Sequence, residues 1–296
     1  MKDLESKAIE RIKTASAMSL HHYGKPLVCT YSGGKDSDVL LELFRRSGIP
    51  FEAHHNHTTV DAPATVYHIR KVFAGLEEKG IACTVKMPNI SMWQLIPLKL
   101  MPPTRAVRYC CSELKENGTP NRCIALGIRW AESNRRAGRA EYEVISPQKK
   151  GRIGVSDEMM FLSDNEDRRR LIEKCDLKAL TAVNPIIDWS DSDIWTFIRA
   201  EKVPYNSLYD CGYLRVGCVG CPMAGKGRYK EFSDFPEYER AYRRAFEKML
   251  EVRKAKGKKS DKWKTADDVF RWWMEDKNIE GQMSIFEFVE ERDDKH

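Results

Sequence analysis

The sequence lacks any long apolar run. None of its hydrophobic stretches approaches the roughly 20 residues that a membrane-spanning helix requires. Residues 1–7 show no trace of the apolar core of a secretory signal peptide. No repeated unit is visible along the 296 residues. We therefore expect a cytoplasmic protein without a membrane partner.

An excess of charge of one sign is also lacking. The chain has 50 Lys and Arg residues against 44 Asp and Glu residues, a formal net charge of +6. Such a small excess permits contact with nucleic acid but does not require it. The basic residues gather around Arg136 and between Arg253 and Lys264, and runs of this kind are more often solvated helix ends than binding surfaces. With 42% hydrophobic residues, the chain can bury the core of one large domain or of two smaller ones.

A glycine-containing segment, Ser-Gly-Gly-Lys-Asp-Ser at 32–37, lies between an apolar stretch at 27–31 and a helical pattern at 39–44. Gly33 and Gly34 let the backbone turn tightly and approach a ligand closely, and the N–H groups at a helix start favour phosphate. Lys35 adds a cation, while Ser32 and Ser37 add hydroxyl donors. The spacer and the Gly-Lys-Ser/Thr ending of a Walker A loop are missing. The segment therefore predicts a phosphate site of another kind, the alternative being a polar turn with a serine or aspartate cap.

Short apolar segments alternate with helical patterns along the first part of the chain. Strand-like stretches at 27–31, 51–56, 81–86 and 123–128 are interleaved with helical stretches at 37–47 and 64–78, after an amphipathic helix at 4–19. This order predicts an α/β fold, a parallel twisted sheet with helices on both faces. In such folds ligands bind beyond the carboxyl ends of the strands, which is where residues 32–37 lie.

The chain changes character near residue 226. Before it, a polar stretch at 146–157 is typical of a loop, and residues 190–193 are suited to start a helix at 194–200. After it, charged and aromatic helical patterns cover 235–253 and 266–275. We predict a nucleotide-binding domain at 1–225 that carries the cysteine cluster, and a mostly helical, charged C-terminal extension at 226–296.

The nine cysteines fall into two groups. Cys29, Cys83, Cys123 and Cys175 lie in apolar patterns typical of buried residues. The remaining ones include the adjacent pair Cys110 and Cys111 and the Cys-x-x-Cys motif of Cys218 and Cys221. A lone motif of this kind indicates zinc, an iron–sulfur cluster or a redox pair, and no thioredoxin-like context supports the last. Adjacent cysteines suit a tetrahedral zinc poorly, so an iron–sulfur cluster is favoured if both pairs ligate.

Together these segments resemble the phosphoadenosine phosphosulfate reductase family of PP-loop ATP pyrophosphatases, whose SGGxDS signature residues 32–37 match. Further matching segments follow in the family's order over residues 25–225. They are 108–111 with Leu114, Lys115 and Pro120, then 127–129 with Glu132, Ser133 and Arg136, then 185–189, 205–210, 212–213 and 217–222. The resemblance implies an adenine nucleotide α-hydrolase-like fold and cleavage of ATP between its α and β phosphates.

The cluster-bearing adenylylsulfate reductases of this family hold a [4Fe–4S] cluster with a Cys-Cys pair and a Cys-x-x-Cys motif. By this resemblance the ligands are Cys110, Cys111, Cys218 and Cys221, with zinc as the alternative metal. Cys211, which lies close to the second motif, is an alternative to Cys110 or Cys111.

The reductases of the family finish their reaction with a cysteine in a C-terminal tail, whereas the last cysteine of this sequence is Cys221. The expected ligand of the loop therefore shifts from an adenylylsulfate to ATP with Mg²⁺. ATP binding combined with a cluster resembles the branch that installs sulfur in nucleic acids, which includes DNA phosphorothioation proteins and cluster-dependent tRNA thiolases. Nucleic acid and a sulfur donor such as a cysteine desulfurase are the implied partners, and an oligomer is compatible with the sequence.

Roles for individual residues follow from this hypothesis. Residues 32–37 bind the ATP phosphates, and Lys35 neutralises charge that develops on the leaving pyrophosphate. Asp36 orients the loop or helps to hold Mg²⁺. Arg129 and Arg136 are candidates to bind a phosphate or the acceptor, because arginine forks suit such oxygens; the alternative is a surface salt bridge.

Two further features lie after the predicted strand at 51–56. Asp61 is expected to line the nucleotide pocket. His54, His55 and His57 suggest a metal site, although we favour ordinary strand-end residues.

Three functions are thus compatible with the sequence. The first is an adenylylating sulfur-transfer enzyme that acts on DNA or RNA and releases pyrophosphate. The second is a phosphoadenylyl- or adenylyl-sulfate reductase that uses an external thiol and forms sulfite without ATP. The third is a non-catalytic nucleotide-binding partner or regulator, which binds ATP without turnover.

Overall fold

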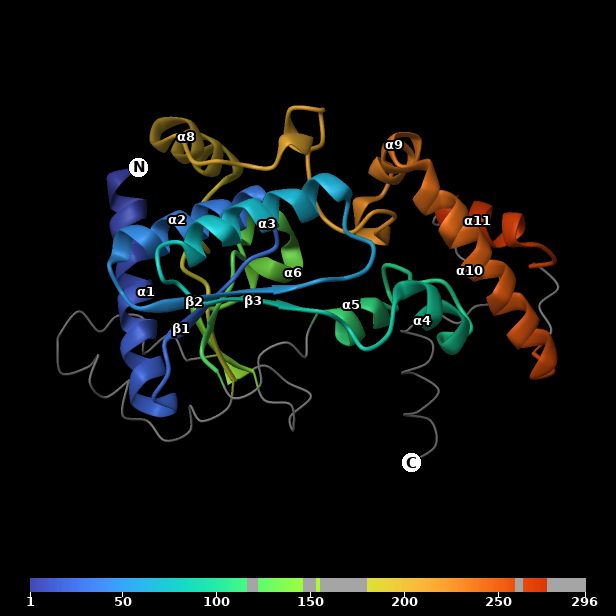
Figure 1. Cartoon of the computed structure of the whole chain (residues 1–296), viewed down its shortest axis with the longest axis horizontal. Helices are drawn as coiled ribbons and strands as arrows, with labels where there is room; N and C mark the ends of the chain where they lie inside the picture. Colours follow the sequence, from blue (N-terminus) through green and yellow to red (C-terminus); the bar gives the residue numbers. More distant parts are fainter. Residues whose placement is uncertain (116–121, 146–152, 155–179, 259–262, 276–296) are drawn as a thin grey trace. The chain divides into compact units, whose positions relative to one another are not determined.

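The computed structural model describes residues 1–115, 122–145, 153–154, 180–258 and 263–275, which leaves Cys175 and most of the predicted loop at 146–157 outside the described residues. The chain divides into two compact units (Figure 1). The first comprises Met1–Ser91 and Cys110–Val219, and the second comprises Met92–Tyr109 and Gly220–His296. The second unit therefore takes in a segment from the middle of the chain, whereas the sequence analysis divided the chain once, at residue 225.

The first unit is built on a seven-stranded sheet with the order β3-β2-β1-β4-β7-β5-β6. Its parallel part consists of β3 (Cys83–Lys86), β2 (Phe51–Asn56), β1 (Leu27–Thr30), β4 (Ile124–Ala125) and β7 (Leu180–Val183). An antiparallel edge follows, made of β5 (Tyr142–Ile145) and β6 (Ile153–Gly154). The predicted parallel sheet is thus confirmed, and the antiparallel edge is an addition that strand periodicity alone did not indicate.

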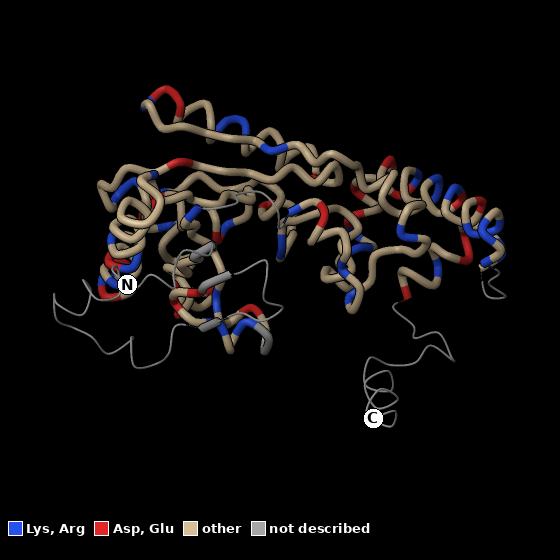
Figure 2. Tube along the Cα trace, turned by 90° about the horizontal axis from the view of Figure 1, so that it is seen from below, with Lys and Arg blue, Asp and Glu red and all other residues tan. Residues whose placement is uncertain are grey.

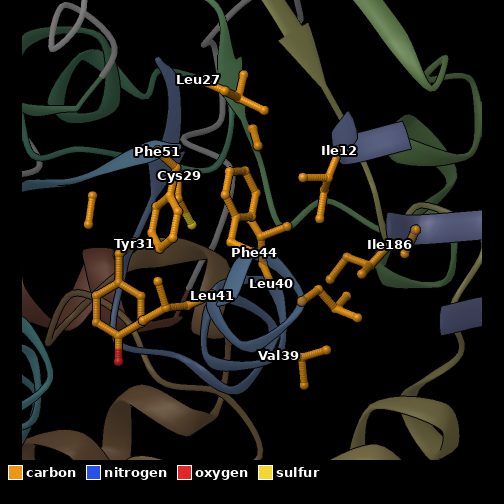
Figure 3. Packing of buried hydrophobic residues seen from close by; sticks show 14 of the residues in the cluster. Ile12, Leu27, Cys29, Tyr31, Val39, Leu40, Leu41, Phe44, Phe51 and Ile186 are labelled. Atoms are coloured by element: carbon orange, nitrogen blue, oxygen red, sulfur yellow. The ribbon is translucent and has the colours of Figure 1, made fainter. Parts of the chain in front are cut away.

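Four helices cover one face of this sheet. They are α1 (Lys2–Tyr23), α2 (Lys35–Ser47), α3 (Pro63–Glu77) and α8 (Asp191–Glu201). Alternate residues of β1 point to opposite faces, so Leu27 and Cys29 join the main core with the helices, while Val28 packs with Ile124 and Ala182 on the other face. Figure 3 shows this main core, in which the rings of Phe44 and Phe51 meet edge to face with centroids 5.2 Å apart.

The helix α8 begins with a capping box. The Ser190 side chain accepts a hydrogen bond from the Asp193 amide at 3.1 Å, and the Asp193 carboxylate accepts one from the Ser190 amide at 2.8 Å. These two bonds satisfy N–H groups that the helix itself leaves without partners. They also fix the first turn, and with it the position of Asp191.

The second unit is helical, as predicted for the C-terminal part of the chain. It contains α4 (Met92–Lys99), α9 (Gly227–Asp234), α10 (Pro236–Ala255) and α11 (Ala266–Glu275). Its centre is aromatic, with the Trp273 ring 4.7 Å from that of Tyr242 and the fully buried Arg228 donating to the Trp273 carbonyl oxygen at 2.9 Å. Basic and acidic positions follow one another along α10 (Figure 2). No helix in the described ranges combines the length and the apolarity needed to cross a membrane.

Candidate functional site

The glycine-containing loop connects β1 to α2 at the carboxyl end of the sheet. Gly33 has φ +74°, and a Cβ atom there would lie 2.9 Å from Ile69 Cγ1 and 3.0 Å from Thr65 Cγ2. Both the backbone conformation and the space therefore require glycine. Gly34 is the N-cap of α2, and its carbonyl oxygen accepts hydrogen bonds from the amide of Ser37 at 2.9 Å and from its hydroxyl at 2.7 Å. The predicted strand–loop–helix arrangement is confirmed.

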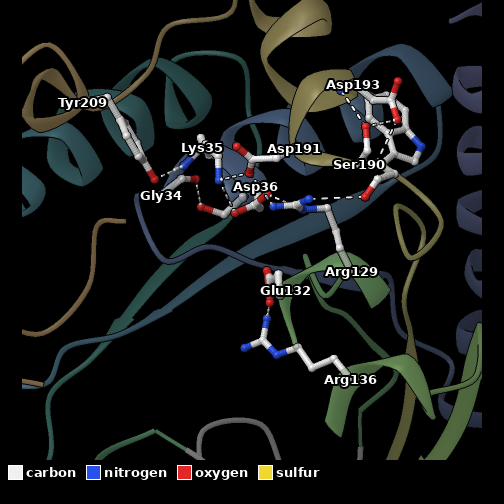
Figure 4. A network of polar contacts seen from close by, with 12 residues as sticks. Gly34, Lys35, Asp36, Arg129, Glu132, Arg136, Ser190, Asp191, Asp193 and Tyr209 are labelled. Carbon is white, nitrogen blue, oxygen red and sulfur yellow. Dashed lines mark hydrogen bonds and ion pairs between the residues drawn. The ribbon is translucent and has the colours of Figure 1, made fainter. Parts of the chain in front are cut away.

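Two cations meet two carboxylates at this loop (Figure 4). Lys35 Nζ lies 2.9 Å from Asp191 Oδ1 and 3.5 Å from Asp36 Oδ2. Arg129 donates from Nε to Asp36 Oδ1 at 2.6 Å and from a terminal nitrogen to Asp191 Oδ1 at 3.0 Å. The structure thus brings Lys35, Asp36 and Arg129 together and adds Asp191, which the sequence had indicated only as part of a helix start at 190–193.

The burial of these four side chains is unequal. The side chains of Lys35 and Arg129 are 7% and 3% exposed, while that of Asp191 is 65% exposed. Burial alone would raise the pKa of Asp191, but the hydrogen bond and charge of Lys35, together with Arg129, lower it. Two nearly buried cations are thus paired with an exposed carboxylate, and a phosphate could take its place, because both anions present oxygens to the same donors.

Two residues of the segment before Cys211 support the loop from outside. The Lys35 amide donates to the Tyr209 hydroxyl at 3.0 Å, and Asn206 Nδ2 donates to the Gly33 carbonyl oxygen at 3.1 Å. Burial raises the pKa of Tyr209, so its hydroxyl stays protonated. In the sequence, Asn206 and Tyr209 stand out only as part of a segment that matches the family. Their contact with the loop could not be predicted from local patterns, because they lie more than 170 residues away from it in the chain.

A buried polar group that sequence reasoning missed lies at the start of α2. The Tyr31 hydroxyl donates to Asp38 Oδ1 at 2.5 Å, and His68 Nε2 lies 2.9 Å from the same oxygen. Burial raises the pKa of Asp38 against the opposing effect of His68. The signal available in the sequence was weak, because Asp38 occupies a position that also suits a solvent-exposed helix start.

Arg136 is not paired with the carboxylates that contact Lys35 and Arg129. It forms an ion pair with Glu132, four positions earlier in the chain, and Figure 4 shows its guanidinium directed toward that carboxylate. Burial and the neighbouring cations Arg215 and Arg139 lower the pKa of Arg136. Its role in binding a phosphate or an acceptor stays a prediction.

Asp61 contacts residues at the end of β2. It is 7% exposed, and its Oδ2 accepts a hydrogen bond from the Thr58 amide at 2.7 Å and lies 3.1 Å from His57 Nδ1. Burial alone would raise the pKa of Asp61, but the hydrogen bonds from His57 and Thr58 outweigh it and lower the pKa to about 2. The predicted place of Asp61 in the nucleotide pocket stays a prediction.

The cysteines predicted as metal ligands are all partly exposed. Cys110 and Cys111 lie on α5 (Tyr109–Leu114), Cys218 forms an isolated backbone bridge with Asp61, and Cys221 is the N-cap of the short helix η5 (Pro222–Ala224). By contrast, Cys29 and Cys123 are buried in the core, and burial raises the pKa of Cys123 to about 12. Cys211 is exposed.

This sheet, with the glycine loop at the carboxyl end of β1 and the cation pair beside it, defines an α/β domain of the PP-loop class. The chain belongs to the family of the phosphoadenosine phosphosulfate reductase domain, whose model matches residues 26–224.

The chain is also similar to named relatives and to solved structures. The chain is 28% identical over 207 residues to adenosine 5'-phosphosulfate reductase 2 of Bacillus subtilis, an alignment that covers 68% of this chain and 74% of the relative. It is 26% identical over 224 residues to an uncharacterised protein of Methanocaldococcus jannaschii, covering 72% of this chain but only 40% of that relative. Among solved structures, phosphoadenylyl-sulfate reductase from Candida auris in a phosphate complex is 16% identical, with a TM-score of 0.43 and coverage of 69% of this chain and 87% of the other.

Proposed function

We propose that the protein is an ATP pyrophosphatase that adenylylates an acceptor, a nucleic acid, for sulfur transfer. The observation that carries this proposal is the pairing of Lys35 and Arg129, both nearly buried, at a glycine loop that opens a helix. Buried cations at the positive end of a helix suit a polyphosphate better than a single carboxylate. Membership of the phosphoadenosine phosphosulfate reductase domain family supports an adenine nucleotide as the ligand.

The reaction proposed needs little covalent chemistry from the protein. The loop at 32–37 holds the phosphates of ATP with Mg²⁺, and an acceptor oxygen attacks the α-phosphorus. The bond from the α-phosphorus to its bridging oxygen breaks, and pyrophosphate leaves with the electron pair. Lys35 and Arg129 stabilise the charge that accumulates on this leaving group, and Asp36 orients both cations through its two carboxylate oxygens.

Cys110, Cys111, Cys218 and Cys221 are the residues that would hold an iron–sulfur cluster. The donor set fits a [4Fe–4S] cluster, because thiolates are the ligands such clusters use and all four side chains are partly exposed rather than sealed in the core. When bound, the cluster would supply a site that accepts or activates sulfur. Zinc in the same thiols is the alternative, and Cys211 is the alternative ligand to Cys110 or Cys111.

The test begins with anaerobic purification of the full chain and analysis of iron and acid-labile sulfide, for which we expect about four of each per chain. Pyrophosphate release is then measured with ATP, Mg²⁺ and candidate DNA and tRNA acceptors. Lys35→Ala should abolish release, whereas Lys71→Ala, on the exposed side of α3, should leave it unchanged. Unchanged release in Lys35→Ala would contradict the assignment of the loop, and a colourless protein that contains zinc would contradict the cluster.

A second candidate function has its own support. The relative in Bacillus subtilis carries the name of a sulfonucleotide reductase, so we also consider reduction of an adenylylsulfate by an external thiol. That reaction forms sulfite and needs no ATP, which separates it from the first proposal in one assay. A protein that binds ATP but shows neither pyrophosphate nor sulfite formation would instead be a nucleotide-binding regulator.

A further inference from the structure

Three side chains with metal-ligating atoms converge beyond β2. His55, His57 and Asp61 each offer one ligand atom, and these atoms all lie within 4.8 Å of one another. Alternation along the strand places His55 and His57 on the same side and His54 on the other. All three belong to the first unit of the fold.

His55 is prepared to act as a ligand. Its Nδ1 lies 2.9 Å from the Tyr31 carbonyl oxygen, and since a carbonyl only accepts, Nδ1 carries the proton and Nε2 carries the lone pair. The residue is 5% exposed, and among the residues that the structure describes its Nε2 has no hydrogen-bond partner. Buried polar atoms are seldom left in this way. Metal-bound histidines share this arrangement, one ring nitrogen donating to a carbonyl and the other binding the ion.

The other two side chains supply the remaining donors. Asp61 Oδ2 is held by the Thr58 amide at 2.7 Å and lies 3.1 Å from His57 Nδ1. Ligand atoms about 2.0–2.1 Å from a tetrahedral ion are about 3.3 Å apart, so this pair has a suitable spacing once the ion replaces the Nδ1 proton that His57 donates to Asp61. The His57 side chain is 21% exposed, and a rotation of its ring can bring the set together.

We propose that His55, His57 and Asp61 form a binding site for a divalent transition-metal ion of the zinc type. Its ligands differ from the proposed cysteine ligands, although Cys218 forms a backbone bridge with Asp61. Two imidazoles and one carboxylate suit zinc, cobalt or iron(II) better than magnesium. Three protein ligands leave a coordination position open for water or a further ligand. The backbone link through Tyr31, which immediately precedes the loop at 32–37, places this site beside the proposed phosphate site.

The test is a Co²⁺ and Zn²⁺ titration of the full chain, its variants His57→Gln and Asp61→Asn, and the control His54→Gln. The control changes a neighbouring histidine that is 7% exposed and bonded to Asn56 instead. Co²⁺ bound to nitrogen and oxygen is distinguished by its absorption from Co²⁺ bound to thiolates. We expect wild type and control to bind one more ion than the two site variants. Where that ion still binds a variant, we expect an affinity lower by at least about 100-fold, since even partners of a ligand contribute about 10–100-fold.

The proposal would be overturned if the wild type, the two site variants and the control, all folded, bound the same number of ions with the same affinity. It would also be overturned if His54→Gln lost as much metal affinity as the site variants. Folding is checked by circular dichroism. If both site variants unfold, the wild type decides: the Nδ1 proton of His55, protected by the Tyr31 carbonyl, should show a paramagnetically shifted NMR signal with Co²⁺. Its absence would contradict the site. None of these readouts depends on ATP turnover, so the result is independent of the proposed function.

Discussion

The Nε–H group of Arg129 donates a hydrogen bond to Asp36 Oδ1 at 2.6 Å. The two residues are 93 positions apart in the chain, and the bond joins the end of the β4 segment to the first turn of α2. A guanidinium that is 3% exposed loses most of its hydration, so the carboxylates of Asp36 and Asp191 must replace it. The proposed phosphate site is therefore held together by contacts within the protein itself.

Replacing Arg129 should affect both stability and anion binding. In Arg129→Gln, Asp36 loses a charged partner, and we expect the free energy of unfolding to fall by about 1–3 kcal/mol. Pyrophosphate should bind about tenfold more weakly or worse, since a hydrogen bond to a charged group contributes about 1.5–3 kcal/mol. Urea unfolding and calorimetric titration measure the two effects. Arg45→Gln is the control, because this exposed arginine of α2 pairs with Glu42; equal losses of pyrophosphate affinity in both variants would contradict the special position of Arg129.

Asp191 should compete with the ligand for the two cations. Its carboxylate lies 2.9 Å from Lys35 Nζ and 3.0 Å from Arg129, yet it is largely exposed. In Asp191→Asn we expect pyrophosphate affinity to rise by about 1.4-fold to fivefold, because an exposed ion pair contributes about 0.2–1 kcal/mol. The control Asp193→Asn removes a charge from the same helical turn that is bonded to Ser190 instead. A lower affinity in Asp191→Asn alone would mean that this carboxylate positions the cations rather than competing for them.

Gly33 can be tested against a matched glycine. Gly33 and Gly48 have φ values of +74° and +70°, so an alanine at either position carries the same backbone strain of about 1–2 kcal/mol. A Cβ atom at Gly33 also meets Ile69 and Thr65, whereas at Gly48 no described atom lies within 4 Å. We expect Gly33→Ala to lower the free energy of unfolding by about 1–3 kcal/mol more than Gly48→Ala. If urea unfolding showed the same loss of unfolding free energy in both variants, α3 would have to shift enough to accommodate the new methyl group.

The capping box of α8 predicts a pH dependence. Hydrogen bonds from Ser190 lower the pKa of Asp193, so the folded state favours its charged form. The resulting stabilisation is complete above the unfolded pKa, about 3.9, and is lost as the pH falls through the lower folded value. Asp193→Ala should lower the free energy of unfolding by about 1 kcal/mol at pH 7, and this difference should shrink below about pH 4.

Thr196→Ala, on the exposed side of the same helix, is the matched control. Its difference from wild type should not change over this pH range, because no ionisable group is altered. A difference between Asp193→Ala and wild type that stays constant from pH 7 to below about pH 4 would rule out the charged cap as its cause.

Local sequence determined a large part of this protein. The strand–glycine–helix order around residues 32–37, the strands at 27–31 and 51–56 and the helical C-terminal segments follow from periodicity, glycine and turn chemistry, which act between near neighbours. The predicted site residues Lys35 and Asp36 lie on that one loop, so their proximity needed no tertiary information.

Tertiary structure decided which distant side chains complete the site. Strand order placed β4 beside β1 and β7 beside β4, which brings Arg129 and Asp191 to Lys35. It also joined His55 through Tyr31 to the loop and set Asp61 beside His57. The sequence offered Arg129 and Arg136 as equal candidates, since two arginines a few residues apart look alike in one dimension. Only the packing of strands showed that Arg129 contacts the carboxylates of Asp36 and Asp191. These contacts join residues far apart in the chain, and local sequence patterns carry no information about such pairs.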